Sequence, residues 1–258
     1  MSPVKTTRQQ LEAYFEELLK PAEFDDYGPN GLQVEGAEEI GRVAFAVSAT
    51  AESIADAIRR EADALVVHHG LFWDFHGAKP ITGPFARRIR PLLKNDINLF
   101  AYHLPLDAHP FVGNNAVLCK ELGVQDLSPF GEFKGSEIGQ GGALPEPLSA
   151  DALRQELSRI LDHTVILASP DESALVNSVG VITGGANNEW ARAQAAGFDA
   201  YVTGEISEHN WHEAREAGMH FYAGGHNATE RFGVQALMQQ TQSYFQLDCF
   251  YIPSPNPA

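Results

Sequence analysis

Two adjacent histidines follow an apolar run in the stretch ALVVHHG, which spans residues 64 to 70. The run is rich in β-branched residues, so it predicts a buried strand that ends at His68 and His69. The carboxyl ends of strands in an open α/β sheet line the crevice where ligands bind. Because imidazole is a good ligand for Zn, Fe and Mn, the pair indicates a metal site, provided that other donors join it.

Three more segments place histidine or carboxylate side chains where predicted strands end. They are FAYHLPLD with His103 and Asp107, AYVTGE with Glu205, and FYAGGHNATE with His226 and Glu230. The four-residue spacing of His226 and Glu230 puts both on one face of a helix, close to its positive N-terminal end. A proline lies between His103 and Asp107, so we expect a loop to present them. A lone histidine at a strand end is more often structural, but its repetition together with carboxylates favours a metal site.

These donors are too many for one tetrahedral zinc ion. We therefore expect two divalent metal ions (Zn, Fe or Mn), bridged by a carboxylate. The two cysteines, Cys119 and Cys249, form no CxxC motif, so the ligands must be nitrogen and oxygen atoms. Four other histidines lie in predicted loops or on a polar helix and are expected at the surface or the rim: His76, His109, His209 and His212.

Apolar periodicity predicts helices and strands that alternate along the chain. In the first half we expect helices at residues 6–19, 52–61 and 84–94, and strands at residues 42–49, 64–68 and 97–103. In the second half, a helix at residues 149–161 precedes the strand SVGVITGGA, the helix NEWARAQAAG, the strand FDAYVTGE, the helix SEHNWHEAREAG and the strand HFYAGG. The stretch 126–148 is rich in Gly and Pro and predicts a linker or short antiparallel strands.

The two halves follow the same plan. The β-α-β unit at residues 178–205 has nearly the length of the unit at residues 42–70, and each is followed by a helix and a strand that runs into polar residues. We therefore expect an α/β fold of two related α/β lobes from an internal duplication, with the metal site between them. Residues 1–128 form the first expected lobe. Residues 129–258 form the second, whose last helix and strand could pack back on the first.

The chain is acidic, with 34 Asp and Glu against 18 Lys and Arg and a formal net charge of −16. Such a field repels nucleic acids and anionic membranes, which bind proteins largely through phosphate groups, so we expect neither as a partner. The first twenty residues contain neither a secretory signal nor a membrane span. We therefore expect a cytoplasmic protein.

Five motifs closely resemble those of the Nif-three-like dinuclear-metal family, many of whose bacterial members are labelled GTP cyclohydrolase 1 type 2 homologues. They are NGLQVEG, VHHGLFW, AYHLPLDAHP, TGEISEHNWHEAREAG and AGGHNATERFG, at residues 30–36, 67–73, 101–110, 203–218 and 223–233. The resemblance extends from the N-terminal helix to the last residues of the chain. Compared with longer members of that family, this chain lacks only the domain that they insert between the lobes.

The resemblance implies a toroidal homohexamer whose dinuclear sites face an internal cavity. It also implies a set of metal ligands that match His68, His69, Asp107, His226 and Glu230. His103 falls outside this set. We expect it next to the ligands, where it could orient Asp107.

Two classes of function fit these observations. The leading hypothesis is a metal-dependent hydrolase of a small molecule, in which two metal ions lower the pKa of a bound water. A cyclohydrolase acting on GTP is suggested by resemblance alone, because the chain has no GxxxxGK[ST] phosphate loop. Glu205, His103 and Thr229 are the candidates for proton transfer or substrate contacts. The competing hypothesis is a non-enzymatic protein that stores or delivers metal or acts as an interaction scaffold.

Aromatic residues follow the paired histidines in the segment LFWDF, at residues 71–75. They either pack against their own domain or against a neighbouring subunit. We expect a closed homo-oligomer, a hexamer by resemblance, in which Trp73→Ala weakens the assembly more than it unfolds the protomer.

Overall fold

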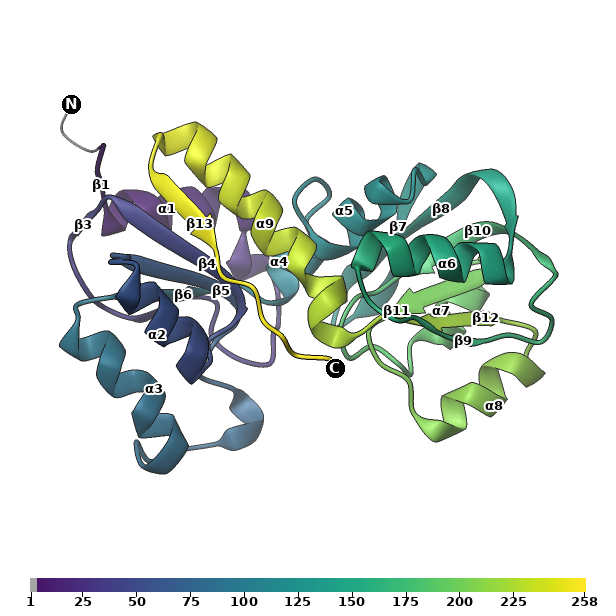
Figure 1. Ribbon diagram of the computed structural model, residues 1–258, viewed down its shortest axis with the longest axis horizontal. Coiled ribbons are helices and arrows are strands. Elements are labelled where there is room, and N and C mark those ends of the chain that lie inside the picture. Colours follow the sequence, from purple (N-terminus) through teal and green to yellow (C-terminus); the bar gives the residue numbers. More distant parts are fainter. Residues whose placement is uncertain (1–3) are drawn as a thin grey trace. The chain divides into compact units, whose positions relative to one another are not determined.

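The computed structural model describes residues 4–258 and divides the chain into two compact units, each with its own sheet and core (Figure 1). The first unit comprises the chain up to Leu106 together with Val234–Ser254, and the second comprises Asp107–Gly233 with Pro255–Ala258. The division lies ahead of the expected boundary at residue 128, because the segment from Asp107 onward packs with the second sheet.

The first unit is built on a five-stranded sheet with the order β13-β4-β5-β6-β2. These strands are β13 (Asp248–Tyr251), β4 (Arg42–Ser48), β5 (Ala64–His69), β6 (Asn98–Ala101) and β2 (Gly31–Val34). β2 is antiparallel to β6, and the other neighbours are parallel. β5 is therefore a central parallel strand, which explains its unbroken apolar run.

Alternating side chains of this sheet serve two separate layers of helices. Leu99 and Ala101 of β6 belong to the core under α2 (Ala51–Arg59) and α3 (Gly83–Lys94). Phe100 and the following Tyr102 point the other way, with ring centroids 5.9 and 5.4 Å from that of Phe15 in α1 (Arg8–Leu19). This period of two places helices on both faces of the sheet.

Smaller elements complete the first unit. A two-stranded antiparallel ribbon pairs β1 (Thr6–Thr7) with β3 (Glu39–Ile40), and two 3-10 turns occur at η1 (Pro21–Glu23) and η2 (Asp74–His76). The division between the units falls inside two helices, α4 (Leu104–Ala108) and α9 (His226–Phe245).

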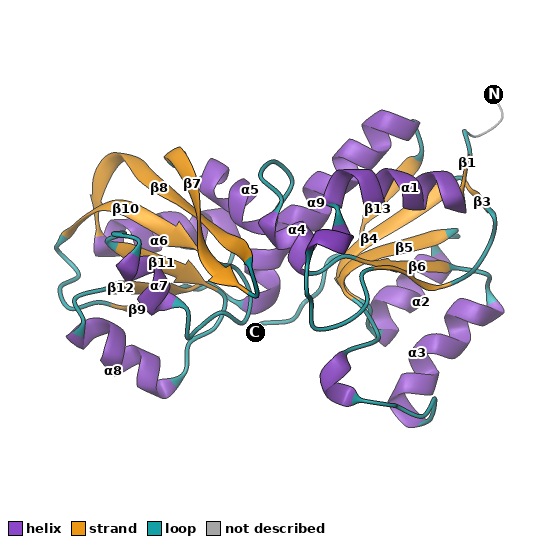
Figure 2. Ribbon diagram, turned by 180° about the vertical axis from the view of Figure 1, so that it is seen from behind, coloured by secondary structure: helices purple, strands orange, loops and turns teal. Residues whose placement is uncertain are grey.

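The second unit contains a six-stranded sheet with the order β7-β8-β10-β11-β12-β9. Its strands are β7 (Gln125–Phe133), β8 (Ser136–Ser149), β10 (Leu175–Val181), β11 (Ala200–Thr203), β12 (His220–Ala223) and β9 (Ile166–Ala168). β10, β11 and β12 are parallel, and the outer strands are antiparallel. The stretch at residues 126–148 is thus the β7–β8 hairpin (Figure 2), the strand alternative of the prediction rather than a linker.

The helices of the second unit also cover both faces of their sheet. Ala200 and Val202 of β11 lie in the core with α5 (Asn114–Glu121) and α6 (Ala150–Leu161). Tyr201, between them, lies in the core with α7 (Trp190–Ala195) and α8 (Glu208–Glu216). The predicted α/β class is confirmed. Four adjacent parallel strands in the first sheet and three in the second agree with an internal duplication, which stays a prediction.

None of the helices within residues 4–258 combines the length and apolar composition that crossing a lipid bilayer requires. Both cysteines, Cys119 and Cys249, are free thiols.

Candidate metal centre

The paired histidines stand at the carboxyl end of β5, where the prediction placed them. His68 is fully buried, and its Nδ1 lies 3.0 Å from the carbonyl oxygen of Tyr102. Since a carbonyl only accepts, Nδ1 carries the proton and Nε2 carries the lone pair of the ring. Nδ1 of His69 lies 2.9 Å from Oγ of Ser48, its partner across the β4–β5 register. Both rings are thereby fixed through Nδ1.

His103 follows β6 and is fixed by a carboxylate that the sequence did not reveal, that of Asp26. Its Nδ1 lies 2.7 Å from Oδ1 of Asp26, whose side chain is only 2% exposed. Asp26 also accepts from the backbone of Tyr27 and Leu104 and from Nδ2 of Asn30. Burial alone would raise the pKa of the Asp26 carboxyl, but the hydrogen bonds from His103, Asn30 and Tyr27 lower it below its usual value. Asp26 is therefore an ionised partner for the imidazole.

The three histidines of the first unit form one group. Their ligand atoms lie within 4.8 Å of one another. The ring of His68 lies 4.6 Å from that of His69 and 4.9 Å from that of His103, measured between centroids. Trp73 closes one side of the group, because its ring contacts both His69 and His103. This indole packs within its own unit, as the first alternative for the LFWDF segment required.

In the second unit, His226 and Glu230 occupy the first turn of α9 and face one another. Nε2 of His226 lies 3.2 Å from Oε2 of Glu230, and its Nδ1 lies 2.6 Å from Oε1 of Glu205. Burial by itself lowers the pKa of the His226 imidazole, but Glu230 and then Glu205 raise it to about 9. A metal ion that binds Nε2 must therefore displace a proton. Glu205 contacts Nδ1, the ring nitrogen that would not bind the metal. A carboxylate in this position commonly orients a metal-binding histidine.

Glycines let two loops approach α9 closely. Gly184 has a φ of +71°, and a Cβ on it would lie 2.0 Å from Oε1 of Glu230. A Cβ on Gly204 would lie 2.7 Å from the Cα of His226. Backbone hydrogen bonds of 2.9 Å join Gly204 to Gly184 and Gly225 to Gly204. Side chains at Gly184 and Gly204 would displace His226 and Glu230. Only glycine at these positions lets the loops lie this close to α9.

Thr229 is part of this scaffold. Its side chain is fully buried, and Oγ1 accepts from the backbone N–H of Gly184 at 3.1 Å while it donates to the carbonyl of Gly225 at 2.9 Å. The hydroxyl proton is used to hold the loop against the helix. We therefore assign Thr229 to the framework of the site, and not to proton transfer.

Asp107 lies in α4, which is a short helix and not the loop that Pro105 led us to expect. The expectation was wrong because Pro105 is the second residue of the helix, where a backbone N–H would have no helical partner. Oδ1 of Asp107 accepts from Nδ2 of Asn114 at 2.9 Å and from Oγ1 of Thr183 at 3.4 Å. Asp107 is 8% exposed and Glu230 is 3% exposed.

The donor chemistry of the second unit fits a metal cation. Ligand oxygens of Asp107 and Glu230 lie within 4.8 Å of each other. Two buried carboxylates at this separation repel each other, and a cation between them removes that cost. With the nearby imidazole of His226, they supply the oxygen and nitrogen ligands that divalent Zn, Fe and Mn accept.

The four other histidines expected at the surface or the rim belong to none of the groups able to hold a metal that residues 4–258 contain. His76 is exposed in η2, and His212 pairs with Glu208 on the surface of α8. His109 accepts backbone N–H groups of its own turn, and His209 contacts an amide of Asn188.

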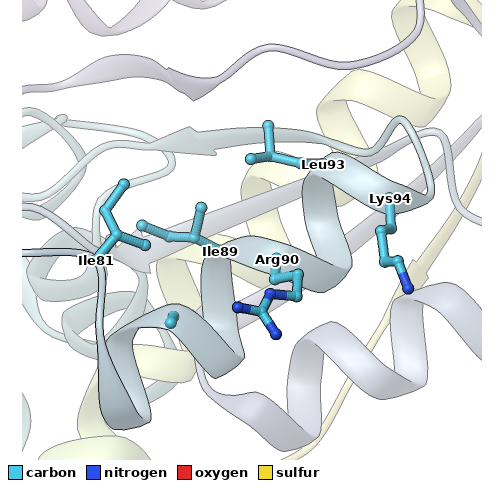
Figure 3. A pocket seen from close by; sticks show the side chains of 6 residues that line it. Ile81, Ile89, Arg90, Leu93 and Lys94 are labelled. Carbon is cyan, nitrogen blue, oxygen red and sulfur yellow. The ribbon is translucent and has the colours of Figure 1, made fainter.

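Described residues of the first unit line a narrow hollow and a larger groove. The narrow hollow borders His68 and His103, but its amides are already used: Asn30 binds Asp26 and His103, and Gln33 binds backbone groups. The larger groove of about 280 Å³ lies on α3 (Figure 3). It contains no metal-binding side chain and is lined by Ile81, Ala86, Ile89, Arg90, Leu93 and Lys94.

Known proteins resemble this chain over almost its full length. It is 40% identical over 249 residues to a curated GTP cyclohydrolase 1 type 2 homolog of Pasteurella multocida, covering 96% of this chain and 98% of that one. The solved structure of ybgI, described as a protein of unknown function, has a TM-score of 0.91 at 40% identity and covers 98% of this chain and all of its own. The protein TTHA1606 of Thermus thermophilus has a TM-score of 0.87 at 33% identity with the same coverage.

The family described as Duf34/NIF3 (NGG1p interacting factor 3) matches residues 6–257. The match includes every histidine and carboxylate described above. This chain therefore belongs to the Duf34/NIF3 family.

Proposed function

We propose that this chain holds a dinuclear metal centre, with His68, His69, Asp107, His226 and Glu230 as ligands. One observation carries the proposal: in each of these histidines a polar partner fixes Nδ1, namely Tyr102, Ser48 or Glu205. These partners fix the ring orientation for binding through Nε2, and the acceptors Tyr102 and Glu205 also keep the proton on Nδ1.

The function that fits this centre best is a metal-dependent hydrolase of a small molecule. When bound, two divalent metals would supply an activated water and an electrophile for the substrate. His103 is the group we propose for proton transfer, because the buried carboxylate of Asp26 holds its Nδ1 and its ring lies in the same group of imidazoles. Glu205, half exposed and bound to His226, orients that ligand.

The identity of the substrate has weaker support. Only the names of curated relatives point to GTP and to a cyclohydrolase. Arg231, the cation that could have met a phosphate, donates instead to the carbonyl of Ile160 at the end of α6. We therefore propose the hydrolase class and leave the cyclohydrolase reaction as the narrower form of the proposal.

A non-enzymatic role in metal storage or delivery is the second candidate. It is favoured by the contrast between well-fixed metal donors and polar groups that are already engaged, such as Asn30, Gln33 and Arg231. A protein that only carries metal needs ligands but no substrate contacts.

Metal-loaded protein tested on phosphoesters, cyclic amides and nucleotides separates the two candidates. Turnover that disappears after chelation and returns with metal supports the hydrolase. If no substrate of the panel is hydrolysed, while the protein transfers its metal to an apo-acceptor, the storage role replaces it. Elemental analysis of the same sample should find about two metals per chain, and a value that never exceeds one would contradict a dinuclear centre.

We also propose that the protein is a closed homo-oligomer, with a hexamer as its expected form. α3 carries four basic residues and no acidic one, in a chain whose formal net charge is −16. The exposed Leu93 of α3 and Ile81, which precedes the helix, line one groove together with Arg90 and Lys94 (Figure 3). Apolar side chains next to cations fit the acidic surface of a second copy of this chain. A cytoplasmic location is kept as part of the proposal, and free thiols are usual there.

A further inference from the structure

The side chain of Asn114 joins Asp107 to the helix that carries Glu230. Asn114 is the first residue of α5 and is fully buried. Its Nδ2 donates to Oδ1 of Asp107 at 2.9 Å, and its Oδ1 accepts from the backbone N–H of Gly233 at 2.7 Å. Gly233 lies three residues after Glu230 in α9. One amide therefore connects the elements that present two of the proposed ligands.

The orientation of this amide is dictated by its partners. The N–H of Gly233 can only donate, so the amide oxygen must face α9 and the amide nitrogen must face Asp107. A Cβ on Gly233 would lie 2.6 Å from Oδ1 of Asn114, so the helix can come this close only with glycine at that position. The amide group of Asn114 can therefore adopt only one orientation.

The next residue, Asn115, is equally buried but bonds only to backbone groups. Its Nδ2 donates to the carbonyls of Asp107 and Ile138, and its Oδ1 accepts from the N–H of Thr183 at 2.8 Å. Thr183 in turn directs its hydroxyl to Oδ1 of Asp107 at 3.4 Å. The carboxylate oxygen that Asn114 holds thus receives a second neutral donor.

A neutral donor suits a carboxylate that must bind a cation. Lysine or arginine at position 114 would pair with Asp107 and compete with the metal, whereas an amide fixes the carboxylate and leaves its charge in place. Leaving the carboxylate to rotate would add an ordering cost to each metal-binding event.

We propose that Asn114 is a positioning residue for metal binding, which holds Asp107 in register with α9 and its ligand Glu230. The inference rests on the proposed metal centre. It assigns Asn114 no contact with metal or substrate, and its effect acts through Asp107.

The test is the zinc affinity of the full-length protein, measured by competition with a chromophoric chelator after metal removal. Asn114→Ser should weaken zinc binding about 10-fold to 100-fold, as is typical when a partner of a metal ligand is lost. The matched control is Asn98→Ser in the first unit. Asn98 is also fully buried, but bonds only to the backbone of Gly36, Ala37 and Asp63. Asn98→Ser should lower the melting temperature of the metal-free protein about as much as Asn114→Ser does, but it should leave the zinc affinity unchanged.

Each result has a distinct meaning. Wild-type protein that binds no zinc, manganese or iron would remove the metal centre itself and the role of Asn114 with it. If the wild type and Asn114→Ser bind zinc equally well, only the positioning role of Asn114 is overturned. The same holds if Asn98→Ser loses as much zinc affinity as Asn114→Ser does. Should Asn114→Ser fail to fold, Thr183→Val removes a single hydroxyl from the same oxygen. That variant should bind zinc several-fold more weakly, and an unchanged affinity would refute the proposal.

Discussion

The two units hold their donors by different means. The first supplies three imidazoles. Its nearby carboxylate, Asp26, already accepts hydrogen bonds from four donors, one of which is His103. The second supplies two buried carboxylates, Asp107 and Glu230, close to each other and to one imidazole. The first group is thus neutral toward a metal, and the second brings the negative charge. We infer that the second unit provides most of the electrostatic attraction for cations, and that the first provides geometry and proton transfer.

The largest effect should come from removing charge in the second unit. Glu230→Gln keeps the shape of the side chain but removes its charge, so metal content should fall from about two per chain to one or less. Affinity should drop by at least 100-fold, beyond the usual cost of losing a partner of a ligand. Elemental analysis and competition with a chelator would measure both.

The control for that change is Glu213→Gln on the exposed face of α8, which should keep full metal content. Circular dichroism of Glu230→Gln should remain that of the wild type. Full occupancy in Glu230→Gln would remove Glu230 from the ligand set and end the contrast between the units.

A change in the first unit should affect stability more than metal affinity. Asp26→Asn leaves buried donors around position 26 without a carboxylate acceptor, which should cost about 1–3 kcal/mol of unfolding free energy. Hydrolytic turnover should fall with it, because His103 loses the group that fixes its Nδ1. Urea unfolding and zinc affinity would be compared, and a loss of metal as large as that of Glu230→Gln would contradict the division of roles.

The same carboxylate predicts a dependence of stability on pH. The pKa of Asp26 is lowered in the folded protein, so the unfolded chain binds the proton more tightly. Its stabilisation is fully present above the unfolded pKa of about 3.9 and is lost as the pH falls through the lower, folded value. Unfolding free energy measured in metal-free protein between neutral and acidic pH should therefore decline less steeply for Asp26→Asn. Parallel curves for the two proteins would refute this assignment.

An intermediate effect is expected from the carboxylate that orients His226. Glu205→Gln keeps a hydrogen-bond acceptor for Nδ1 but weakens its attraction for the ring, so zinc affinity should fall about 10-fold. The loss should be smaller than for Glu230→Gln, because Glu205 is half exposed and lies outside the proposed ligand set. A loss equal to that of Glu230→Gln would instead make Glu205 a ligand.

The smallest effect on the protomer should come from the surface we propose for assembly, which we take to include the LFWDF segment at residues 71–75 as well as α3. Trp73 contacts His69 and His103, so Trp73→Ala would disturb the donors as well as any interface. Phe75 is 69% exposed and stacks on Trp73 from outside, which makes Phe75→Ser the cleaner probe. Combined with Arg90→Glu, it should dissociate the oligomer while the melting temperature stays within a few degrees.

Light scattering at micromolar concentration would decide the matter. A wild-type monomer would remove the assembly proposal, and a variant of unchanged mass would remove this surface from it. Arg159→Glu, which reverses an exposed charge on α6, serves as a control that should leave the mass unchanged.

Local patterns were sufficient to predict much of the fold. The apolar run of β5 and the spacing of His226 and Glu230 correctly indicated a strand end and the first turn of a helix. The hairpin at residues 125–149 was left open between two alternatives, because its glycines and prolines weaken any periodic signal. The helical turn at Asp107 was missed, since proline is unfavourable inside a helix but acceptable at its start.

The sequence by itself determined which donor types occur and that they follow strands, because the chemistry of a side chain and the alternation along a strand are local properties. Only the tertiary structure decided what holds those donors. Asp26 reaches His103 across 77 positions, and Asn114 reaches Gly233 across 119. Such partners leave no periodic trace in either segment. They meet because tertiary packing brings distant loops and helices together, and buried polar groups there must find hydrogen-bond partners.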